Sequence, residues 1–329
     1  MIILGIAAEH NSSATLMKNG KILGIVQEER LTKNKNQCAF PLLAIKELIE
    51  NHLNGDYKLI DRVVYGTIKS DPYFTALNFY SGYSVEEQIN DMKNYWYKKY
   101  YKKKNTTNSY WKNKYKKKIN VNKNHNYDFS FLSKKMTYEE EINYFSEIER
   151  KSVVLKHFSK LKNISFLDHH TCHAYYALYG GELSEKKFKD TLVVTADAYG
   201  DNKNWSISIV NKDGTLNRLA SGNNFTVARI YKFCTLILGM KPNEHEYKVM
   251  GLSSYSNSHY HIEKVEKIFF DVLDFKKGLF KSKKPLIDSY FDLKMRLEGH
   301  RFDNIAAALQ NWSSKVTLKW IEYWLKRTK

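Results

Sequence analysis

Three histidines lie close together in the stretch LDHHTCHAYYALYG, which begins at Leu167, although the whole chain has only 11 histidines. If a helix begins just after Leu167, His169 and His173 lie one turn apart on one face, about 5 to 6 Å from each other, and His170 points about 100° away. Two imidazoles on one face could bind one metal ion, and such sites usually add a third protein ligand, often a carboxylate. The alternative is that these histidines only cap and pack a short helix. No Glu follows the first histidine, which argues against a zinc protease of the H-E-x-x-H type.

The chain opens with a strand and a β-hairpin, the first of the elements that must position such a site. The N-terminal run MIILGIAA predicts a buried strand, and Asn19-Gly20 falls between two further apolar runs. Both residues tolerate positive φ, so they predict a type I′ turn. The same pattern returns from Thr191, where three strands are expected and two of them are joined by the turn Asn211-Lys212-Asp213-Gly214.

This repetition predicts an α/β protein with two lobes on one plan, residues 1–189 and residues 190–329. Within the first lobe, Pro41 opens a helix that ends at Asn54-Gly55, and the run from Arg62 is a buried strand. Further helices are expected at 139–158, 227–238, 261–272 and from about 303 to the end.

The net charge of +18 is concentrated in one segment. Residues 93–118 contain 11 lysines and no acidic residue, so the rest of the chain carries about +7. Lysines interleaved with Tyr and Trp could neutralise phosphates and stack on bases. The alternative, which we favour, is a partly helical surface insert of biased composition over about 93–125, so a nucleic-acid partner is not expected.

Composition excludes several classes of protein. With 43% hydrophobic residues among 329, the chain can bury a sizeable core. No apolar run reaches the roughly 18 to 20 residues that span a bilayer, and the apolar N-terminus has no basic leader. Cys38, Cys172 and Cys234 suggest neither a disulfide framework nor a zinc ribbon. We therefore expect a cytoplasmic protein without a membrane partner.

Four stretches, in order along the chain, resemble segments of the O-carbamoyltransferase family, which includes the nodulation-factor and tobramycin carbamoyltransferases. The family's first hairpin, with its His-x-x-Ser phosphate loop, is similar to the opening stretch MIILGIAAEHNSSATLMKNGKILGIVQEERLTKNKNQCAFP. Its metal helix resembles DHHTCHAYYA, its second phosphate loop resembles TLVVTADAYGD, and its Gly-Glu-Tyr-Lys-x-Met-Gly-Leu segment resembles GMKPNEHEYKVMGLSSY. Each stretch alone is weakly specific, and the ordered set is fairly specific.

The resemblance implies an actin/sugar-kinase/Hsp70-like (ASKHA) fold, in which two lobes enclose an adenylate, similar to the tRNA threonylcarbamoyladenosine transferase. It implies biosynthetic transfer of a carbamoyl group from carbamoyladenylate to a hydroxyl of a small molecule, such as a sugar or natural product. The carbamoyladenylate is made from ATP and carbamoyl phosphate by a separate YrdC-like domain. It also implies that His169 and His173 bind a divalent metal, usually iron, beside the nucleotide.

Carbamoyl transfer needs a base for the acceptor hydroxyl, together with positive charge or hydrogen-bond donors for the phosphate and carbonyl oxygens. His10, on the loop after the first strand, is our candidate base because an imidazole titrates near neutral pH. The alternative is an exposed loop histidine. Asn11, Ser12 and Ser13 offer donors to phosphate, although a plain turn would favour the same residues. Lys35 could contact phosphate or could be a surface charge.

Four more candidates come from the second lobe. Asp197 and Gly200 belong to the expected second phosphate loop, where Gly200 permits close backbone approach. The family pattern there is Asp-Gly-x-Gly, and Ala198 departs from it. Lys248 could neutralise a phosphate or the carbamoyl carbonyl, and Glu246 could orient ribose or acceptor hydroxyls. The alternative is that these two form a solvated ion pair.

The final helix corresponds in the family to the helix before an apolar strand and a Gly-Gly-x-x-x-Asn loop. By this resemblance the second ASKHA lobe is incomplete over these residues, and the carboxylate metal ligand and the YrdC-like domain are expected elsewhere. They would come from a longer gene product or from a separate chain, or else the protein has lost activity.

Two other functions fit parts of the sequence. A small-molecule kinase of the same fold would bind ATP with Mg²⁺ and would have no histidine pair, so Mg²⁺ dependence without iron would favour it. A catalytically silent module could instead bind nucleotide or nucleic acid. Binding of nucleic acid through the Lys/Tyr insert would depend steeply on salt and would be lost on deleting residues 93–118.

Overall fold

The computed structural model describes residues 1–71, 83–103, 109–119, 129, 134–180 and 191–328. The chain forms two compact units, unit 1 from residues 1–83 and 106–172 and unit 2 from residues 84–105 and 173–329. The last of the chain's three passages between them, at 172/173, falls within a continuous helix, α9 (His169–Tyr179). The boundary expected from the sequence at 189/190 lies outside the described residues.

Unit 1 is built on a five-stranded sheet of order β3-β2-β1-β4-β5. The first three strands are antiparallel neighbours, and the last two run parallel to β1. Asn19 and Gly20 join β2 to β3 with φ angles of 51° and 81°, which confirms the expected turn. The strands are β1 (Ile2–Ala7), β2 (Ser13–Lys18), β3 (Lys21–Gln27), β4 (Arg62–Tyr65) and β5 (Ile164–Phe166).

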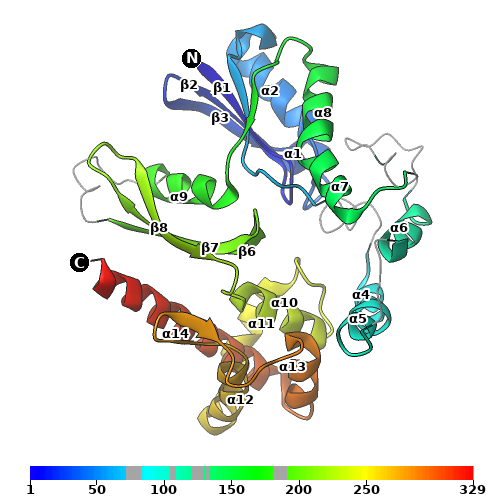
Figure 1. The fold of residues 1–329 in the computed structure, drawn as a ribbon, viewed down its shortest axis with the longest axis vertical. Helices are drawn as coiled ribbons and strands as arrows, with labels where there is room; N and C mark the ends of the chain where they lie inside the picture. The colour runs from blue at the N-terminus through cyan, green and yellow to red at the C-terminus, as the bar shows by residue number, and fades with distance from the viewer. Residues whose placement is uncertain (72–82, 104–108, 120–128, 130–133, 181–190, 329) are drawn as a thin grey trace. The chain divides into compact units, whose positions relative to one another are not determined.

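Helix α2 (Leu42–Leu53) lies against β2 and β3 (Figure 1). Its buried residues recur at helical spacing, and it ends at Asn54 in the left-handed conformation, as the sequence predicts. The short helix α1 (Glu28–Thr32) was not expected. Its first residue, Glu28, is buried, and its carboxylate accepts hydrogen bonds from the backbone N–H groups of Leu43 and Ala44. It therefore supplies acceptors for two N–H groups that have no partner within α2.

The helix expected at 139–158 is present in three consecutive pieces: α7 (Tyr138–Asn143), a π-helical segment (Tyr144–Glu149) and α8 (Arg150–His157). The capping box of Thr137 and Glu140 fixes its start. Arg150 lies buried just after the π-helical segment, and its guanidinium donates to the carbonyl oxygens of Thr67, Ile68 and Ser146. This one side chain therefore ties the segment after β4 to the helix.

Unit 2 contains a three-stranded antiparallel sheet of order β6-β7-β8, which repeats the βββ plan of unit 1. The strands are β6 (Leu192–Gly200), β7 (Lys203–Val210) and β8 (Leu216–Gly222). Val193 on β6 packs against Ala174 and Leu178 of α9. On the opposite face of the sheet, Ile207 joins the main core of the unit. The sheet thus has helices on both faces.

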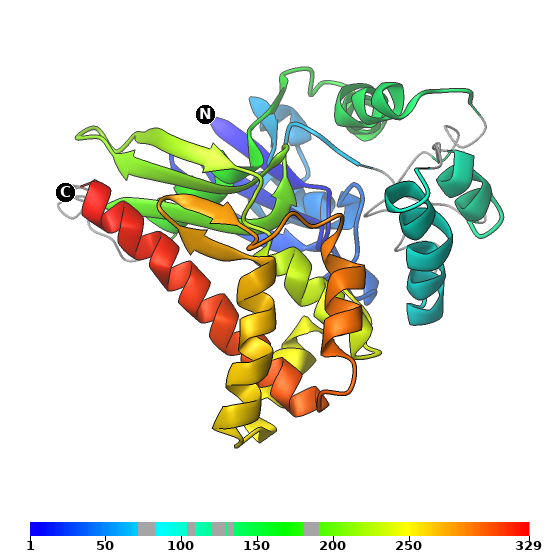
Figure 2. The same cartoon turned by 60° about the horizontal axis from the view of Figure 1, so that its bottom comes forward.

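The remaining elements of unit 2 are helical, apart from one small hairpin (Figure 2). Helices are present at the three positions the sequence predicts, and α12 packs along α14. Helices α11 and α13 and the β9–β10 hairpin were not expected. The elements are α10 (Val227–Ile237), α11 (Glu246–Leu252), α12 (His259–Val272), β9 (Asp274–Lys276), β10 (Leu279–Lys281), α13 (Ser289–Leu297) and α14 (Phe302–Arg327).

The Lys- and Tyr-rich insert is shared between the two units. Helix α5 (Tyr97–Tyr100) belongs to unit 2, as does α4 (Val85–Asp91) just before the insert, and α6 (Ser109–Lys116) belongs to unit 1. The ring of Tyr97 packs edge-on against Phe291, and Tyr115 is buried. Several aromatic rings that base stacking would require are therefore used in packing. The parts of 93–125 at 104–108 and 120–125 lie outside the described residues.

The architecture confirms the expected mixed α/β class, while the ASKHA assignment stays a prediction. Within the described ranges, no helix has the length and apolar character needed to cross a membrane.

Candidate functional site

Helix α9 carries both expected metal ligands, and Asp168 fixes where it starts. The Asp168 carboxylate accepts the backbone N–H and the hydroxyl of Thr171, each at 2.9 Å, in the manner of an N-cap. His169 and His173 therefore lie one turn apart within a single helix. His170 is fully buried, with its ring nearly perpendicular to that of His169. The sequence correctly separated His170 from the other two.

A carboxylate from β6 lies beside the two histidines. Nε2 of His173 is 3.6 Å from Oδ2 of Asp197, and one donor atom from each of His169, His173 and Asp197 lies within 4.8 Å of the others. Two donors that each bind a metal at about 2.1 Å are separated by about 3 to 3.5 Å. The cluster is therefore slightly wider than a coordinated site. Two imidazoles and one carboxylate suit a divalent transition metal such as iron or zinc.

The β6–β7 register explains why Asp197 points toward α9. The two strands pair regularly as far as Ala196 and Trp205, and pairing resumes at Gly200 and Lys203. The residues between form a bulge, and bulges commonly re-aim a side chain. The backbone N–H of Ala198 donates to Oδ1 of Asp197 at 2.6 Å. One carboxylate oxygen is thus held by the backbone while the other faces His173.

The cluster remains accessible. Half of the His173 side chain and a third of the Asp197 side chain are exposed to solvent. The family resemblance led us to expect the carboxylate ligand elsewhere, and in the structure the carboxylate of Asp197 lies within reach of both histidines. The sequence placed Asp197 and Gly200 in a phosphate loop and gave no indication that Asp197 would approach His173.

In unit 1, the loop after β1 is held by backbone hydrogen bonds. Ser12 donates its N–H to the carbonyl of Gln37 at 2.7 Å and accepts the N–H of Glu28 at 2.9 Å. His10 and Asn11 are exposed, and Asn11 adopts a left-handed φ of 58°. Ser12 is fully buried, and its Oγ has no hydrogen-bond partner in the described part of the chain. The side chains that face solvent here are therefore those of His10 and Asn11.

The basic segment after α1 lies beside that loop. Lys35 is exposed and is followed by Asn36, whose N–H donates to Glu29 at 2.9 Å. The bond between Gln37 and Ser12 then joins this segment to the loop, and Ser13 begins β2. The structure thus brings the unit 1 candidates onto two adjoining segments.

The unit 2 candidates on α11 adopt different environments. Glu246 accepts the N–H of Asn243 at 2.7 Å in the first turn, whereas Lys248 is exposed. Among the described residues these two side chains form no ion pair with each other, and the nearby Lys241 pairs with Glu244 at 2.6 Å. Lys232 on α10, which the sequence did not single out, lies near Glu246. Burial lowers the pKa of Lys232 below its ordinary value, although the charge of Glu246 acts in the opposite direction.

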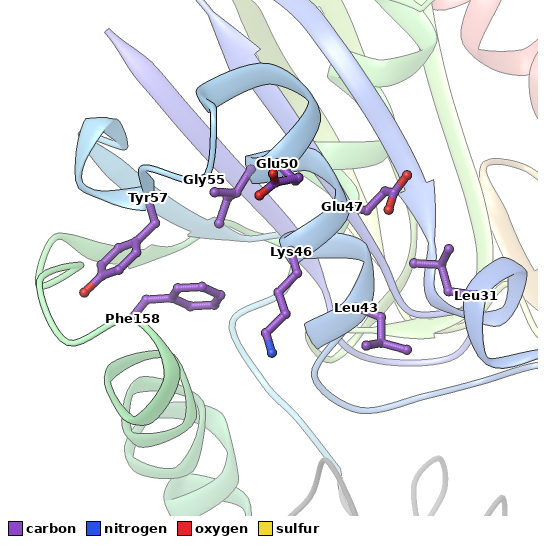
Figure 3. Close-up of a pocket in the computed structure, with 9 residues that line it drawn as sticks. Leu31, Leu43, Lys46, Glu47, Glu50, Gly55, Tyr57 and Phe158 are labelled. Atoms are coloured by element: carbon purple, nitrogen blue, oxygen red, sulfur yellow. The ribbon is translucent and has the colours of Figure 1, made fainter.

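A groove of about 580 Å³ on unit 1 has no connection with these candidates (Figure 3). Lys46, Glu47 and Glu50 line it from α2, and Tyr57 and Phe158 line it from neighbouring segments. None of the candidate site residues lines it. Apolar side chains, among them Leu31 and Leu43, complete the lining, and the groove is wide open to solvent.

Comparison with known proteins connects the chain to one family. It matches the family described as "Carbamoyltransferase N-terminus" over residues 2–328. It is 28% identical over 254 residues to an uncharacterized protein of Methanocaldococcus jannaschii, covering 77% of this chain and 33% of that protein. It is 24% identical over 343 residues to an uncharacterized protein of Synechocystis sp., covering 96% of this chain and 47% of that protein. The chain thus spans about a third and about half of the lengths of these relatives. It belongs to the carbamoyltransferase N-terminus family.

Proposed function

We propose that this protein transfers a carbamoyl group from carbamoyladenylate to a hydroxyl of a small-molecule acceptor, beside a divalent metal held by His169, His173 and Asp197. Family membership supports a carbamoyl-transfer role in general. The observation that carries the finer proposal is the convergence of these three side chains, with donor atoms within 4.8 Å of one another. Two imidazoles and a carboxylate on one side of a metal ion would leave its remaining coordination positions open to substrate oxygens.

The donor set fits iron or zinc. When bound, the metal would supply Lewis-acid chemistry, polarising a phosphate or acceptor oxygen and orienting it. Asp197 would contribute negative charge to balance the ion, and its bond from the Ala198 N–H restricts its rotation. His169 and His173 would bind through neutral imidazoles, so protonation would compete with the metal.

His10 is the proposed general base. Its imidazole is exposed on the loop after β1, so an acceptor hydroxyl could approach it. As the acceptor oxygen attacks the carbamoyl carbon, an imidazole nitrogen of His10 takes the hydroxyl proton. The bond between the carbamoyl carbon and the phosphate oxygen then breaks, and AMP leaves with its phosphate negatively charged.

The other candidates are assigned to the adenylate and the acceptor. Lys35 and Lys248 are exposed cations that could neutralise phosphate charge, and the Asn11 side chain is an exposed amide donor. Ser12 would hold the loop in place and would not contact the phosphate, because its hydroxyl is fully buried and its N–H already donates to the carbonyl of Gln37. Glu246 keeps one carboxylate oxygen beyond its bond to Asn243, and this oxygen could accept from a ribose hydroxyl.

The reaction can be tested with [¹⁴C]carbamoyl phosphate, ATP and an added enzyme that forms carbamoyladenylate. The purified chain, loaded with Fe²⁺ under anaerobic conditions, is mixed with sugar, nucleoside and aminoglycoside acceptors. The proposal predicts ¹⁴C in an acceptor, with loss of transfer in His10→Ala and in His173→Ala. His261→Ala, an exposed histidine on α12, serves as the matched control. Transfer of ³²P from [γ-³²P]ATP to an acceptor, with no ¹⁴C transfer, would instead identify a kinase.

A further inference from the structure

The proposed metal site draws its ligands from two elements. Both imidazoles lie on α9, whereas the carboxylate of Asp197 comes from the β6 bulge. The distance between imidazoles and carboxylate therefore depends on how α9 is seated on the sheet of unit 2. The helix contacts β6 through small and medium side chains, Ala174 and Leu178 against Val193. Such a contact permits some rolling of the helix about its axis, because apolar packing is not directional.

Two tyrosine hydroxyls add directional contacts from α9 to the β7–β8 hairpin. The hydroxyl of Tyr179 donates to the carbonyl of Gly214 at 2.9 Å, and the hydroxyl of Tyr175 accepts the N–H of Leu216 at 3.4 Å. The two rings are stacked one turn apart, with centroids separated by 6.1 Å. The tyrosines thus hold the helix at two points along one line.

The hairpin turn that receives these bonds is itself internally bonded. Asn211 donates its N–H to the carbonyl of Thr215 at 2.8 Å, and Asp213 accepts the N–H and the hydroxyl of Thr215. Gly214 has a φ of 80°, which favours glycine at this position. The turn therefore presents its carbonyl from a restrained geometry, so it can act as a fixed anchor.

Helical periodicity places the tyrosines where they resist a roll. Counting about 100° per residue from His173, Ala174 is rotated by about 100° and Tyr175 by about 200°. The face of the helix that packs on the sheet, with Ala174 and Leu178, thus lies between the face that carries the histidines and the face that carries the two tyrosines. A roll that lifts the tyrosines from the hairpin moves the histidines toward the sheet, and the reverse roll moves them away.

The distance between the imidazole nitrogens on α9 and the carboxylate of Asp197 is sensitive to such a roll. Side-chain atoms lie about 5 to 6 Å from the helix axis, so a roll of about 10° moves an imidazole nitrogen by about 1 Å. Metal–ligand distances in working sites vary by only about 0.2 Å. Small changes in the seating of α9 would therefore separate His173 from Asp197 by more than a bound ion tolerates.

We propose that Tyr175 and Tyr179 are positioning residues, which set the distance from His169 and His173 to Asp197 through their hydroxyl contacts with the β7–β8 hairpin. This inference rests on the proposed metal site. It assigns part of the metal affinity to two groups that do not touch the metal.

The test compares metal affinity in Tyr175→Phe, Tyr179→Phe and their double variant, each of which removes only a hydroxyl. Tyr176→Phe is the matched control, because Tyr176 is on the same helix, is 72% exposed, and its hydroxyl makes no hydrogen bond to a described residue. Affinity for Zn²⁺ is measured by competition with a chromophoric chelator. We expect the double variant to bind about 10- to 100-fold more weakly, the loss typical of residues that orient metal ligands. Tyr176→Phe should bind as the unaltered protein does.

A double-mutant cycle separates positioning from a general loss of structure. In an Asp197→Asn background, removing the two hydroxyls should cause little further loss of Zn²⁺ affinity, because they act through the distance to Asp197. An equal loss in both backgrounds, or no loss in either, overturns the positioning role. If the unaltered protein binds no Zn²⁺ and no Fe²⁺, the proposed metal site itself fails. If the positioning role alone fails, the unaltered protein still binds the metal tightly.

Discussion

Asn in place of Asp197 tests the proposed metal centre with the smallest change in shape. Asp197 is one of three candidate ligands, and its Oδ2 lies 3.6 Å from His173 Nε2. Replacing the carboxylate by a neutral amide removes the charge that balances the ion. Loss of a residue that only orients a ligand costs about 10- to 100-fold in affinity. Loss of a direct ligand should therefore weaken Zn²⁺ binding by about 100-fold or more, equivalent to at least about 2.7 kcal/mol.

The matched control is Asp201→Asn, which changes the net charge equally. Asp201 lies in the turn after β6 with a φ of 50°, a conformation that Asn also tolerates, and it is outside the three-residue cluster. Both variants are titrated with Zn²⁺ against a chromophoric chelator, and their thermal unfolding without metal is compared. We expect Asp201→Asn to bind as the unaltered protein does. Equal affinities for Asp197→Asn and the unaltered protein would refute the reasoning, as would an equal loss in both variants.

Three further predictions concern stability, each measured by urea unfolding. Arg150→Met should lower the unfolding free energy by about 3 to 5 kcal/mol, because it leaves buried carbonyls without their donor; a change below 1 kcal/mol would contradict this. Glu28→Ala should cost about 2 kcal/mol by exposing the unsatisfied start of α2, and no change would show that water replaces the carboxylate. Burial alone would raise the pKa of Asp274, but hydrogen bonds from Lys319 and Lys276 lower it. A carboxyl group whose pKa is lower in the folded than in the unfolded protein stabilises the folded protein at any pH above its unfolded pKa. That stabilisation is lost as the pH falls through the folded pKa. Lys319→Met should therefore cost about 1 kcal/mol at pH 7 and less in acid, whereas a cost independent of pH would contradict the pairing.

Local sequence signals predicted much of the fold. The turn at Asn19-Gly20 and the end of α2 at Asn54 depend on left-handed backbone, which few residue types tolerate. The long helices α12 and α14 were predicted because their buried residues recur at helical spacing. Helix α11 has seven residues and each strand of the β9–β10 hairpin has three, so their patterns are too short to reveal a period.

The candidate site was predictable only within single elements. The spacing of His169 and His173 follows from helical geometry, and so does the placement of His170 on another face, whereas the burial of His170 is a tertiary feature. The approach of Asp197 depends on a bulge in the β6–β7 pairing and on the seating of α9, which are tertiary features. The backbone hydrogen bond from Ser12 to Gln37 likewise joins residues that are distant in sequence. Neither contact leaves a periodic or compositional signal.

The most direct test of the proposed centre is X-ray absorption spectroscopy of the chain loaded with one equivalent of Fe²⁺ or Zn²⁺. The proposal predicts scattering from two imidazoles and one carboxylate oxygen, with first-shell distances of about 2.0 to 2.2 Å. One imidazole should disappear from the spectrum in His173→Ala. A bound ion whose spectrum shows no imidazole, or is identical in His173→Ala, would contradict a metal centre built from His169, His173 and Asp197.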